Sequence, residues 1–201
     1  MVLTVAEPVR AAGAIPIGVV QDGKVPVESS RPLESEEIPS LVQRAQENDR
    51  DAFGELYRLF HAQVFRLARF YLDSSAEDAV AETFLRAWNA LPRYRNTGAP
   101  FVAWLYGIAR HVVADERLRR RRIEPRPEVP DRAIDPPPDD RLALAMAIQR
   151  LPEEDRRVIE LKFLIGLTNA EVAAALGKSA GAVNTQQWRA LRSLRRLIEE
   201  K

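Results

Sequence analysis

The chain has 201 residues, of which 46% are hydrophobic and 29% are charged, and its formal net charge is +1. This composition is typical of a folded, soluble protein of one or two domains. The overall charge says little about partners, because arginines cluster locally at residues 117–122 and 189–196. Cysteine is absent and there are only two histidines, which excludes disulfides and thiol chemistry and nearly excludes metal sites built from His and Cys. No metal or other cofactor is expected.

The first 37 residues contain proline, glycine and scattered valine without a sustained period, so a disordered tail is expected over residues 1–37. The longest uncharged run there, residues 11–21, is about half of the ~20 apolar residues that a membrane span needs. The sequence here does not fit a signal peptide either, because it contains Pro8, Arg10 and Pro16. We therefore expect a cytoplasmic protein without a membrane span.

Helical periodicity begins at Ile38 and continues to Arg122. Apolar residues recur at steps of three and four at Leu56, Leu59, Phe60, Val64, Leu67, Ala68 and Tyr71. A further helix is predicted over residues 77–91, with Ser75 as its N-cap. After a loop at residues 96–100, a long helix is predicted from about Phe101 to Arg122.

Residues 123–140 interrupt this pattern. The segment holds six of the 14 prolines of the chain, and six acidic residues as well. Such a segment cannot form a helix interior and buries little, so a flexible Pro-rich linker is predicted. Fully extended, it reaches roughly 60 Å, enough to let two domains occupy distant sites.

Residues 141–201 are again helical. Pro152 is placed in the first turn of a helix, Thr168–Glu171 reads as a capping box, Gly177 ends that helix, and Ser179 caps the next. A short helix, a glycine-containing turn and a second helix indicate a helix-turn-helix. With no strand-like alternation of useful length, the predicted class is all-α, with two helical domains at residues 38–122 and 141–201.

The last helix carries the first functional signal. At 100° per residue, one apolar stripe comprises Val183, Ala190, Leu191, Leu194, Leu197 and Ile198. The opposite side comprises Asn184, Thr185, Trp188, Arg189, Arg192, Arg195 and Arg196. Hydrogen-bonding side chains near the start of a helix and arginines along it suit DNA reading, whereas the charge run alone fits an ordinary solvated surface. The capping box, the glycine turn and the aromatic residue together favour DNA.

The helix over residues 77–91 carries the second signal. Its buried stripe is predicted to comprise Val80, Phe84, Ala87, Trp88 and Leu91. Asp78 and Glu82 lie one turn apart on the other side, with Leu85 and Asn89 beside them. An apolar spot among charges suits a partner surface. On spacing alone, however, an ordinary solvated face is the better interpretation.

The third signal is the segment from Asn96 to Arg122. Its aromatic and apolar residues, interleaved with arginines, suit single-stranded nucleic acid, where bases stack and phosphates are neutralised. The alternative is that Trp104, Leu105, Ile108 and Val112 belong to the core, which we expect for most of them. The loop at residues 96–100 and the arginines at its far end remain as surface candidates.

Four segments in this order resemble a known family. They are LVQRAQENDRDAFGELYRLFHAQVFRLA (41–68), AEDAVAETFLRAWNALPRYR (76–95), FVAWLYGIARHVVADERLRRRR (101–122) and LPEEDRRVIELKFLIGLTNAEVAAALGKSAGAVNTQQWRALRSLRRLI (151–198). The first three resemble region 2 of the extracytoplasmic-function (ECF) sigma factors of the sigma-70 family, and the last resembles region 4. The resemblance covers roughly residues 38–122 and 141–199. No single short motif is diagnostic, but the ordered set is specific.

The resemblance implies a sigma factor that binds core RNA polymerase, directs it to promoters and promotes DNA melting, without being an enzyme. By this resemblance, the residues that dock on the clamp coiled coil of the polymerase β′ subunit are Asp78, Glu82, Leu85 and Asn89. Contacts to the −10 element fall to Asn96, Thr97, Gly98, Arg117, Arg119 and Arg120. Contacts to the −35 element fall to Asn184, Thr185, Trp188, Arg189 and Arg192, while region 4 also binds the β flap. The family often has an anti-sigma factor as a further partner.

Three positions of the recognition helix depart from the family pattern. A basic residue is usual at the position of Asn184 and frequent at that of Gln186, and an apolar residue is usual at that of Gln187. We expect Arg189 to bind a guanine and Asn184 an adenine, each through two hydrogen bonds.

Two other classes remain as alternatives. A conventional helix-turn-helix regulator accounts for residues 150–196 but not for the acidic helix or the aromatic segment, and it binds duplex DNA without polymerase. An enzyme is the third class. The sequence contains no GxGxxG, P-loop, HExxH or GxSxG motif to support it.

Overall fold

The computed structural model describes residues 37–123 and 140–199. The predicted tail and almost all of the predicted linker lie outside these ranges. Every regular element in the described residues is helical and none is a strand, which confirms the all-α class.

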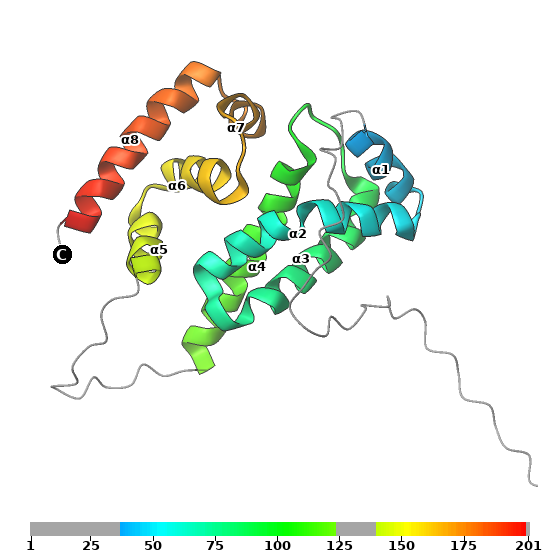
Figure 1. The fold of residues 1–201 in the computed structure, drawn as a ribbon, viewed down its shortest axis with the longest axis horizontal. Helices are drawn as coiled ribbons and strands as arrows, with labels where there is room; N and C mark the ends of the chain where they lie inside the picture. The colour runs from blue at the N-terminus through cyan, green and yellow to red at the C-terminus, as the bar shows by residue number, and fades with distance from the viewer. Residues whose placement is uncertain (1–36, 124–139, 200–201) are drawn as a thin grey trace, which may run out of the picture. The chain divides into compact units, whose positions relative to one another are not determined.

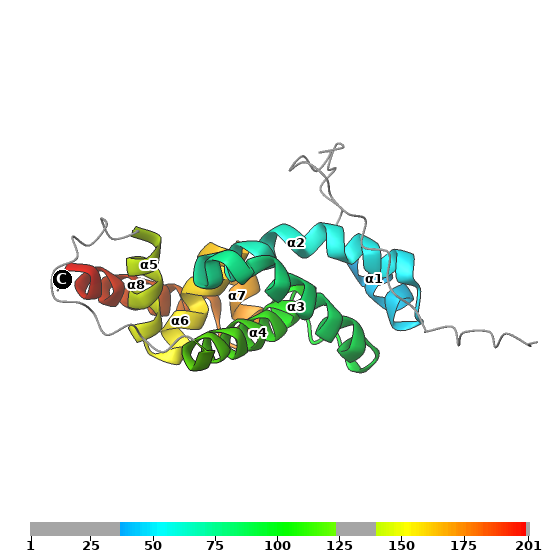
Figure 2. The same ribbon diagram turned by 90° about the horizontal axis from the view of Figure 1, so that it is seen from below.

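The helices of the first region, residues 37–123, pack around α2. They are α1 (Glu37–Gln46), α2 (Arg50–Leu72), α3 (Ala76–Ala90) and α4 (Phe101–Ile123), with short 3₁₀ turns at Asp73–Ser75 and Leu91–Arg93. The long helix α2 contacts α1, α3 and α4, and α3 contacts α4 along its length (Figures 1 and 2). Leu56 and Leu67 of α2, Val80 of α3 and Leu105 of α4 are fully buried where these helices meet. The amphipathic spacing of the sequence therefore produces this core.

The boundaries of these helices differ slightly from the prediction. Helix α1 begins at Glu37, one residue before the expected domain start, and α3 begins at Ala76. Ser75 occupies the N-cap position of α3, but its side chain makes no capping hydrogen bond. The backbone of Ser75, with φ −98° and ψ 18°, lies outside the extended region that an N-cap typically adopts.

The second region, residues 140–199, ends in the predicted helix-turn-helix. Its helices are α5 (Asp140–Arg150), α6 (Glu153–Ile159), α7 (Asn169–Leu176) and α8 (Ala180–Glu199). Pro152 is the N-cap of α6 rather than a residue of its first turn. Gly177 ends α7 in the left-handed conformation with φ 63°, as predicted, and Ser179 caps α8 by accepting the backbone N–H of Ala182 at 3.2 Å.

Helix α8 packs on α5, α6 and α7, and its buried side is rotated from the predicted stripe. Val183, Ala190 and Leu194 are buried as expected, but Leu191 and Ile198 are 39% and 45% exposed. At 100° per residue those two lie at one edge of the stripe, and the contacts lie towards the other edge. Gln186 on that other edge is buried instead.

The predicted capping box of α7 is present in full. The Thr168 hydroxyl accepts the backbone N–H of Glu171, and the Glu171 carboxylate accepts the backbone N–H of Thr168 at 2.7 Å. We therefore expect Thr168→Ala to lower the stability of this region by about 1 kcal/mol, since it removes one half of the box. Chemical denaturation measures the loss. Thr168→Ser keeps the acceptor and serves as control, so equal losses in both variants would contradict a capping role.

Between α6 and α7 the chain forms a π-helical turn, η3 (Glu160–Ile165), that the sequence does not predict. Gly166 closes it with φ +91°, and its N–H donates to the carbonyl of Leu161, five residues back, at 3.1 Å. A π-turn inserts an extra residue and changes the direction in which side chains point. Here it accompanies the burial of Glu160, which is only 2% exposed.

Candidate functional site

The predicted polymerase-binding residues share the open face of α3. Asp78 and Asn89 are exposed, and the Leu85 side chain is 50% exposed. Glu82 accepts a hydrogen bond from Arg86 at 2.7 Å, and Arg86 also pairs with Asp115 of α4 at 3.0 Å. The buried stripe of α3 lies on the opposite side, at Val80, Phe84 and Ala87, as the sequence predicted, whereas Trp88 is only partly buried. The face therefore consists of an exposed leucine among charged and amide groups.

The loop before α4 presents its polar residues to solvent. Asn96, Thr97 and Gly98 are exposed, and the Asn96 side-chain oxygen accepts the backbone N–H of Gly98 at 2.9 Å. Gly98 has a φ of +81°, which a residue with a side chain adopts only with strain. The hydrogen bond and the glycine together shape the loop tip.

Aromatic rings support this loop from below. Phe101 and Trp104 of α4 pack against Tyr94, with ring centroids 5.4 Å and 5.0 Å from that of Tyr94. Phe101 is buried and Trp104 partly buried. Most of the aromatic residues of this segment therefore serve the core, as expected, and the loop remains available at the surface.

The arginines near the end of α4 are held by other side chains. Arg119 donates to both oxygens of Glu116 at 2.7 and 2.8 Å, and Arg120 donates to Glu116 at 3.3 Å and to Ser74 at 3.1 Å. The hydrogen bonds from Arg119, together with those from Arg120, lower the pKa of Glu116 to about 2. This cluster retains a positive charge because two guanidinium groups share one carboxylate.

Arg117 faces a different direction from its neighbours. Its guanidinium lies 5.8 Å from the centre of the Tyr71 ring and donates to the side chain of Gln149 on α5. It is half-buried. Of the predicted −10 residues, Arg117 therefore lies among contacts with the second region and not on the same surface as the loop.

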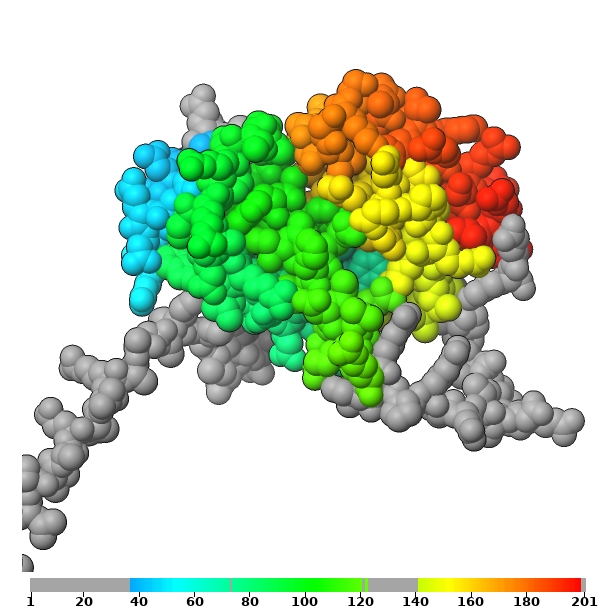
Figure 3. All heavy atoms as spheres, turned by 180° about the vertical axis from the view of Figure 1, so that it is seen from behind, coloured from blue at the N-terminus to red at the C-terminus, as the bar shows by residue number. Residues whose placement is uncertain are grey.

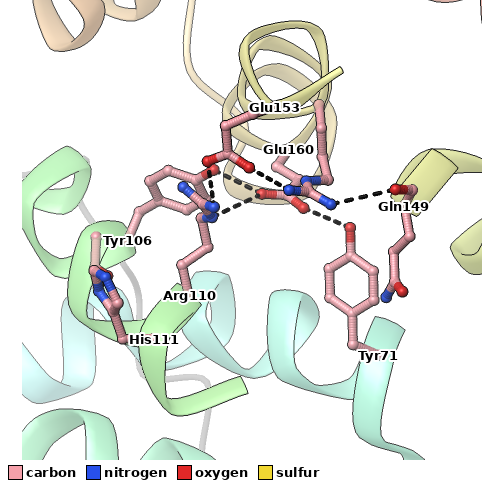
Figure 4. Close-up of polar contacts among 9 residues, drawn as sticks. Tyr71, Tyr106, Arg110, His111, Gln149, Glu153 and Glu160 are labelled. Carbon is pink, nitrogen blue, oxygen red and sulfur yellow. Dashed lines mark hydrogen bonds and ion pairs between the residues drawn. The ribbon is translucent and has the colours of Figure 1, made fainter. Parts of the chain in front are cut away.

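The contacts between the first and second regions centre on Glu160 of η3, which the sequence did not indicate as a functional residue. Figure 4 shows its carboxylate between two tyrosines of the first region. The Tyr71 hydroxyl donates to Oε1 at 2.5 Å and the Tyr106 hydroxyl donates to Oε2 at 2.6 Å. Arg110 lies 3.9 Å from the same carboxylate and also pairs with Glu153 of α6. Burial raises the pKa of both tyrosines above the usual value of 10.0, and the negative charge of Glu160 raises it further.

The recognition helix α8 presents a large aromatic residue at its surface. Trp188 is 65% exposed, and the guanidinium of Arg192 lies 5.5 Å from its ring centre. Thr185, one turn earlier, is exposed and donates its hydroxyl proton to the carbonyl of Gly181 at 3.1 Å. Figure 3 shows the helix-turn-helix, coloured orange to red, as a continuous surface.

Behind this surface a buried aspartate holds Arg189. Asp155 of α6 is 4% exposed and accepts hydrogen bonds from Gln186 and Arg189, each at 3.1 Å. Gln186 in turn accepts from Lys178 at 2.8 Å, and Lys178 pairs with Glu154 at 2.7 Å. The Arg189 side chain is still 63% exposed. Asp155 thus fixes one end of a guanidinium whose remaining donors face solvent.

The last predicted DNA contact, Asn184, is exposed and is bound by Asn169 at the start of α7. The same Asn169 amide donates to Gln187 at 3.1 Å. The sequence offered no signal for this bridge beyond the position of Asn169 next to the N-cap. It accounts for a polar residue at position 187, where the family usually has an apolar one.

Within residues 37–123 and 140–199 there is no group of three or more His, Asp and Glu side chains arranged to hold a metal ion. None of the helices in these ranges is long and apolar enough to cross a membrane.

Comparisons with known proteins agree with this arrangement. Residues 56–123 match the family model for Sigma-70 region 2, and residues 141–194 match that for Sigma-70, region 4. The chain is 37% identical over 179 residues to the ECF RNA polymerase sigma factor BldN of Streptomyces coelicolor, a match that covers 83% of this chain and 68% of BldN. It is 34% identical over 194 residues to the ECF RNA polymerase sigma factor SigD of Mycobacterium tuberculosis, covering 89% and 92% of the two chains.

A solved structure is also similar. The structure of CnrH in complex with the cytosolic domain of CnrY matches with a TM-score of 0.55 and 26% sequence identity, covering 81% of this chain and 97% of that one. The two family regions occur in the expected order, and the two relatives match over 83% and 89% of this chain. The chain therefore belongs to the ECF RNA polymerase sigma factors of the sigma-70 family.

Proposed function

We propose that this sigma factor docks on core RNA polymerase through α3 and reads promoters with two separate surfaces, the loop at residues 96–98 and the recognition helix α8. Sigma factors bind core polymerase, direct it to specific promoters and promote DNA melting at initiation. In this division of roles, residues 38–122 contact polymerase and the −10 element, and residues 141–201 contact the −35 element. The protein performs no catalysis itself and acts in the cytoplasm, where polymerase and DNA are found.

The observation that carries this proposal is the surface of α8. Trp188 is exposed on a helix whose other side is buried, and Arg192 lies against its ring. An exposed aromatic ring with an arginine against it suits contact with the edge of a base and its phosphate. Thr185 lies one turn closer to the start of the helix, where base edges of the major groove come within reach.

The polymerase surface is supported by the exposed face of α3. Asp78 and Glu82 supply negative charge around Leu85, with Asn89 one turn further. We assign this face to the clamp coiled coil of the β′ subunit, and region 4 to the β flap. CnrH was solved in complex with the cytosolic domain of CnrY, which supports a further protein partner for this chain, and we assign that place to an anti-sigma factor.

The −10 contacts are assigned to the loop and the basic end of α4. Asn96, Thr97 and Gly98 form an exposed tip on an aromatic base. Arg119 and Arg120 supply positive charge at the other end of α4, roughly 27 Å along the helix from Phe101, and Arg117 is engaged with Gln149 and Tyr71. Polar groups that contact bases and arginines that neutralise phosphates suit single-stranded DNA.

Reconstitution tests the whole proposal. The purified chain is mixed with core RNA polymerase and used for in vitro transcription on genomic fragments. We expect stable co-elution with core polymerase and transcripts that share −10 and −35 sequences, with little binding of promoter duplex by the chain alone. Tight binding of duplex DNA without polymerase, and no transcription with it, would identify a conventional regulator and overturn the proposal.

A further inference from the structure

Asn169, the first residue of α7, connects the two helices of the helix-turn-helix. Its side-chain nitrogen donates one hydrogen bond to Oδ1 of Asn184 and another to Oε1 of Gln187, the latter at 3.1 Å. Asn184 and Gln187 lie one turn apart near the start of α8, and Asn184 is exposed. A single amide on the first helix therefore holds two amides of the recognition helix.

The direction of these hydrogen bonds follows from the number of hydrogens available. A side-chain amide nitrogen carries two hydrogens, and here two acceptors receive them. The Asn169 oxygen is buried and has no hydrogen-bond partner. Turning all three amides round would bury the two N–H groups of Asn169 without acceptors, and buried unpaired N–H groups are rarer in proteins than under-satisfied carbonyls. The observed orientation is therefore the favoured one.

We propose that Asn169 is a positioning residue that sets base preference at the −35 element. It turns the oxygens of Asn184 and Gln187 towards α7, so that the exposed Asn184 offers its NH₂ group to the major groove, while the partly buried Gln187 holds Asn169 in place. The inference rests on the proposed role of α8 in reading promoter bases. It concerns which hydrogen-bonding groups α8 presents there, and not only which residues lie close to DNA.

The chemistry of the base edges then indicates the target. In the major groove guanine presents two acceptors, N7 and O6, and thymine presents O4, whereas cytosine presents a donor and adenine one of each. An NH₂ group at this position matches guanine, which has two acceptors, best and cytosine worst. The adenine pair expected for Asn184 from sequence needs its oxygen facing the base, and in this structure that oxygen is bound to Asn169. Guanine, or thymine, replaces adenine as the expected partner.

Substitution of Asn169 tests this role without removing the support of α7. The helix is capped by Thr168 and Glu171 and anchored by buried Val172 and Ala173, none of which depends on the Asn169 side chain. Asn169→Asp keeps the size of the side chain, and a negative charge in the first turn of a helix is stabilising. A carboxylate only accepts hydrogen bonds, so Asn184 and Gln187 must turn round, and Asn184 then offers its oxygen to the groove.

The experiment is in vitro transcription by reconstituted holoenzyme on promoters randomised at the −35 element, with the wild-type protein, Asn169→Asp, Asn169→Ala and Asn184→Ala. For each protein, preference is the ratio of transcription from promoters that differ in one base. An added negative charge lowers affinity for all promoters alike, so its effect cancels in this ratio. Asn169→Asp is expected to move preference from guanine and thymine towards adenine and cytosine by about tenfold at one or two positions. Asn169→Ala is expected to lose discrimination at the same positions without reversing it.

The Asn184→Ala protein distinguishes failure of the proposed base reading by α8 from failure of the proposed positioning role of Asn169. If it lowers transcription evenly over the library, base reading by this part of α8 fails, and the inference fails with it. If it changes preference at a position where both Asn169 variants keep the wild-type preference, the reading function stands and the positioning role of Asn169 is refuted. Far-UV circular dichroism of each variant verifies that the helices are intact.

Discussion

Replacing Asp78 and Glu82 with arginine is expected to abolish binding of this sigma factor to core RNA polymerase while leaving its helices intact. Both residues lie on the exposed face of α3, beside the half-exposed Leu85. Charges reversed within an interface cost several kcal/mol, so we expect the dissociation constant to rise by at least about 100-fold. The folded core is untouched, because α3 packs through Val80, Phe84 and Ala87 on its other side.

A matched variant separates a specific effect from a change in overall charge. Glu47→Arg with Asp51→Arg makes the same change in net charge at exposed positions near the start of α2, outside helix α3. Pull-down with core polymerase and circular dichroism are measured for both double variants. Retained binding by the Asp78/Glu82 variant, with normal helicity, would show that this face of α3 is only a solvated surface.

The parts of the fold that depend on neighbouring residues were predictable. The capping box at Thr168 and Glu171, the left-handed Gly177 and the Ser179 cap each need only a few consecutive residues, and each is present. The buried side of α3 followed from helical spacing for the same reason, apart from Trp88. Ser75 was the exception, because the backbone before α3 is a 3₁₀ turn that its side chain does not cap.

Features that need distant partners were not predictable. Glu160 looks like any acidic residue on a helix surface, yet it is buried between Tyr71 and Tyr106, which lie 89 and 54 residues away in the chain. Periodicity cannot find such a contact, and it also misses the π-turn that accompanies it. Leu191 was placed in the buried stripe because spacing describes one helix and not the direction of its neighbours.

The residues of the candidate site also divide into those that the sequence indicated and those that it did not. Sequence and resemblance selected the exposed residues Asp78, Leu85, Asn96 and Trp188, because exposed groups are unconstrained by the fold and stand out from the apolar pattern. The residues that orient those groups were missed. Asp155 and Asn169 are ordinary helix-start residues in sequence, and only the packing of α6 and α7 against α8 makes them partners of Arg189 and Asn184.

Removing the hydroxyls of Tyr71 and Tyr106 is expected to have the largest effect on stability. Each hydroxyl donates to the buried carboxylate of Glu160, and a hydrogen bond to a charged group contributes about 1.5–3 kcal/mol. In the Tyr71→Phe, Tyr106→Phe double variant the carboxylate loses both of these donors and keeps the guanidinium of Arg110 at 3.9 Å. We therefore expect the contact of η3 with α2 and α4 to loosen, seen as faster amide hydrogen exchange in η3 and a lower unfolding midpoint.

Tyr57→Phe is the control, because that residue is 37% exposed and lies away from Glu160. The two single variants complete a double-mutant cycle. Their losses of stability should not add, because both hydroxyls donate to one carboxylate. Equal hydrogen exchange in the Tyr57 variant and the double variant would show that the hydroxyls contribute nothing to this contact.

Alkaline pH tests the same contact without mutation. Burial, followed by the charge of Glu160, raises the pKa of Tyr71 and Tyr106 in the folded protein above the 10.0 of a free tyrosine. A raised pKa means that the folded state holds these protons more tightly than the unfolded state. Their contribution to stability is therefore complete below pH 10 and is lost as the pH rises above it. Unfolding followed across this range should show a steeper alkaline loss for the wild-type protein than for the Tyr71→Phe, Tyr106→Phe variant. Parallel curves would mean that the two phenols ionise as freely in the folded chain as in the unfolded one, and would contradict their burial against Glu160.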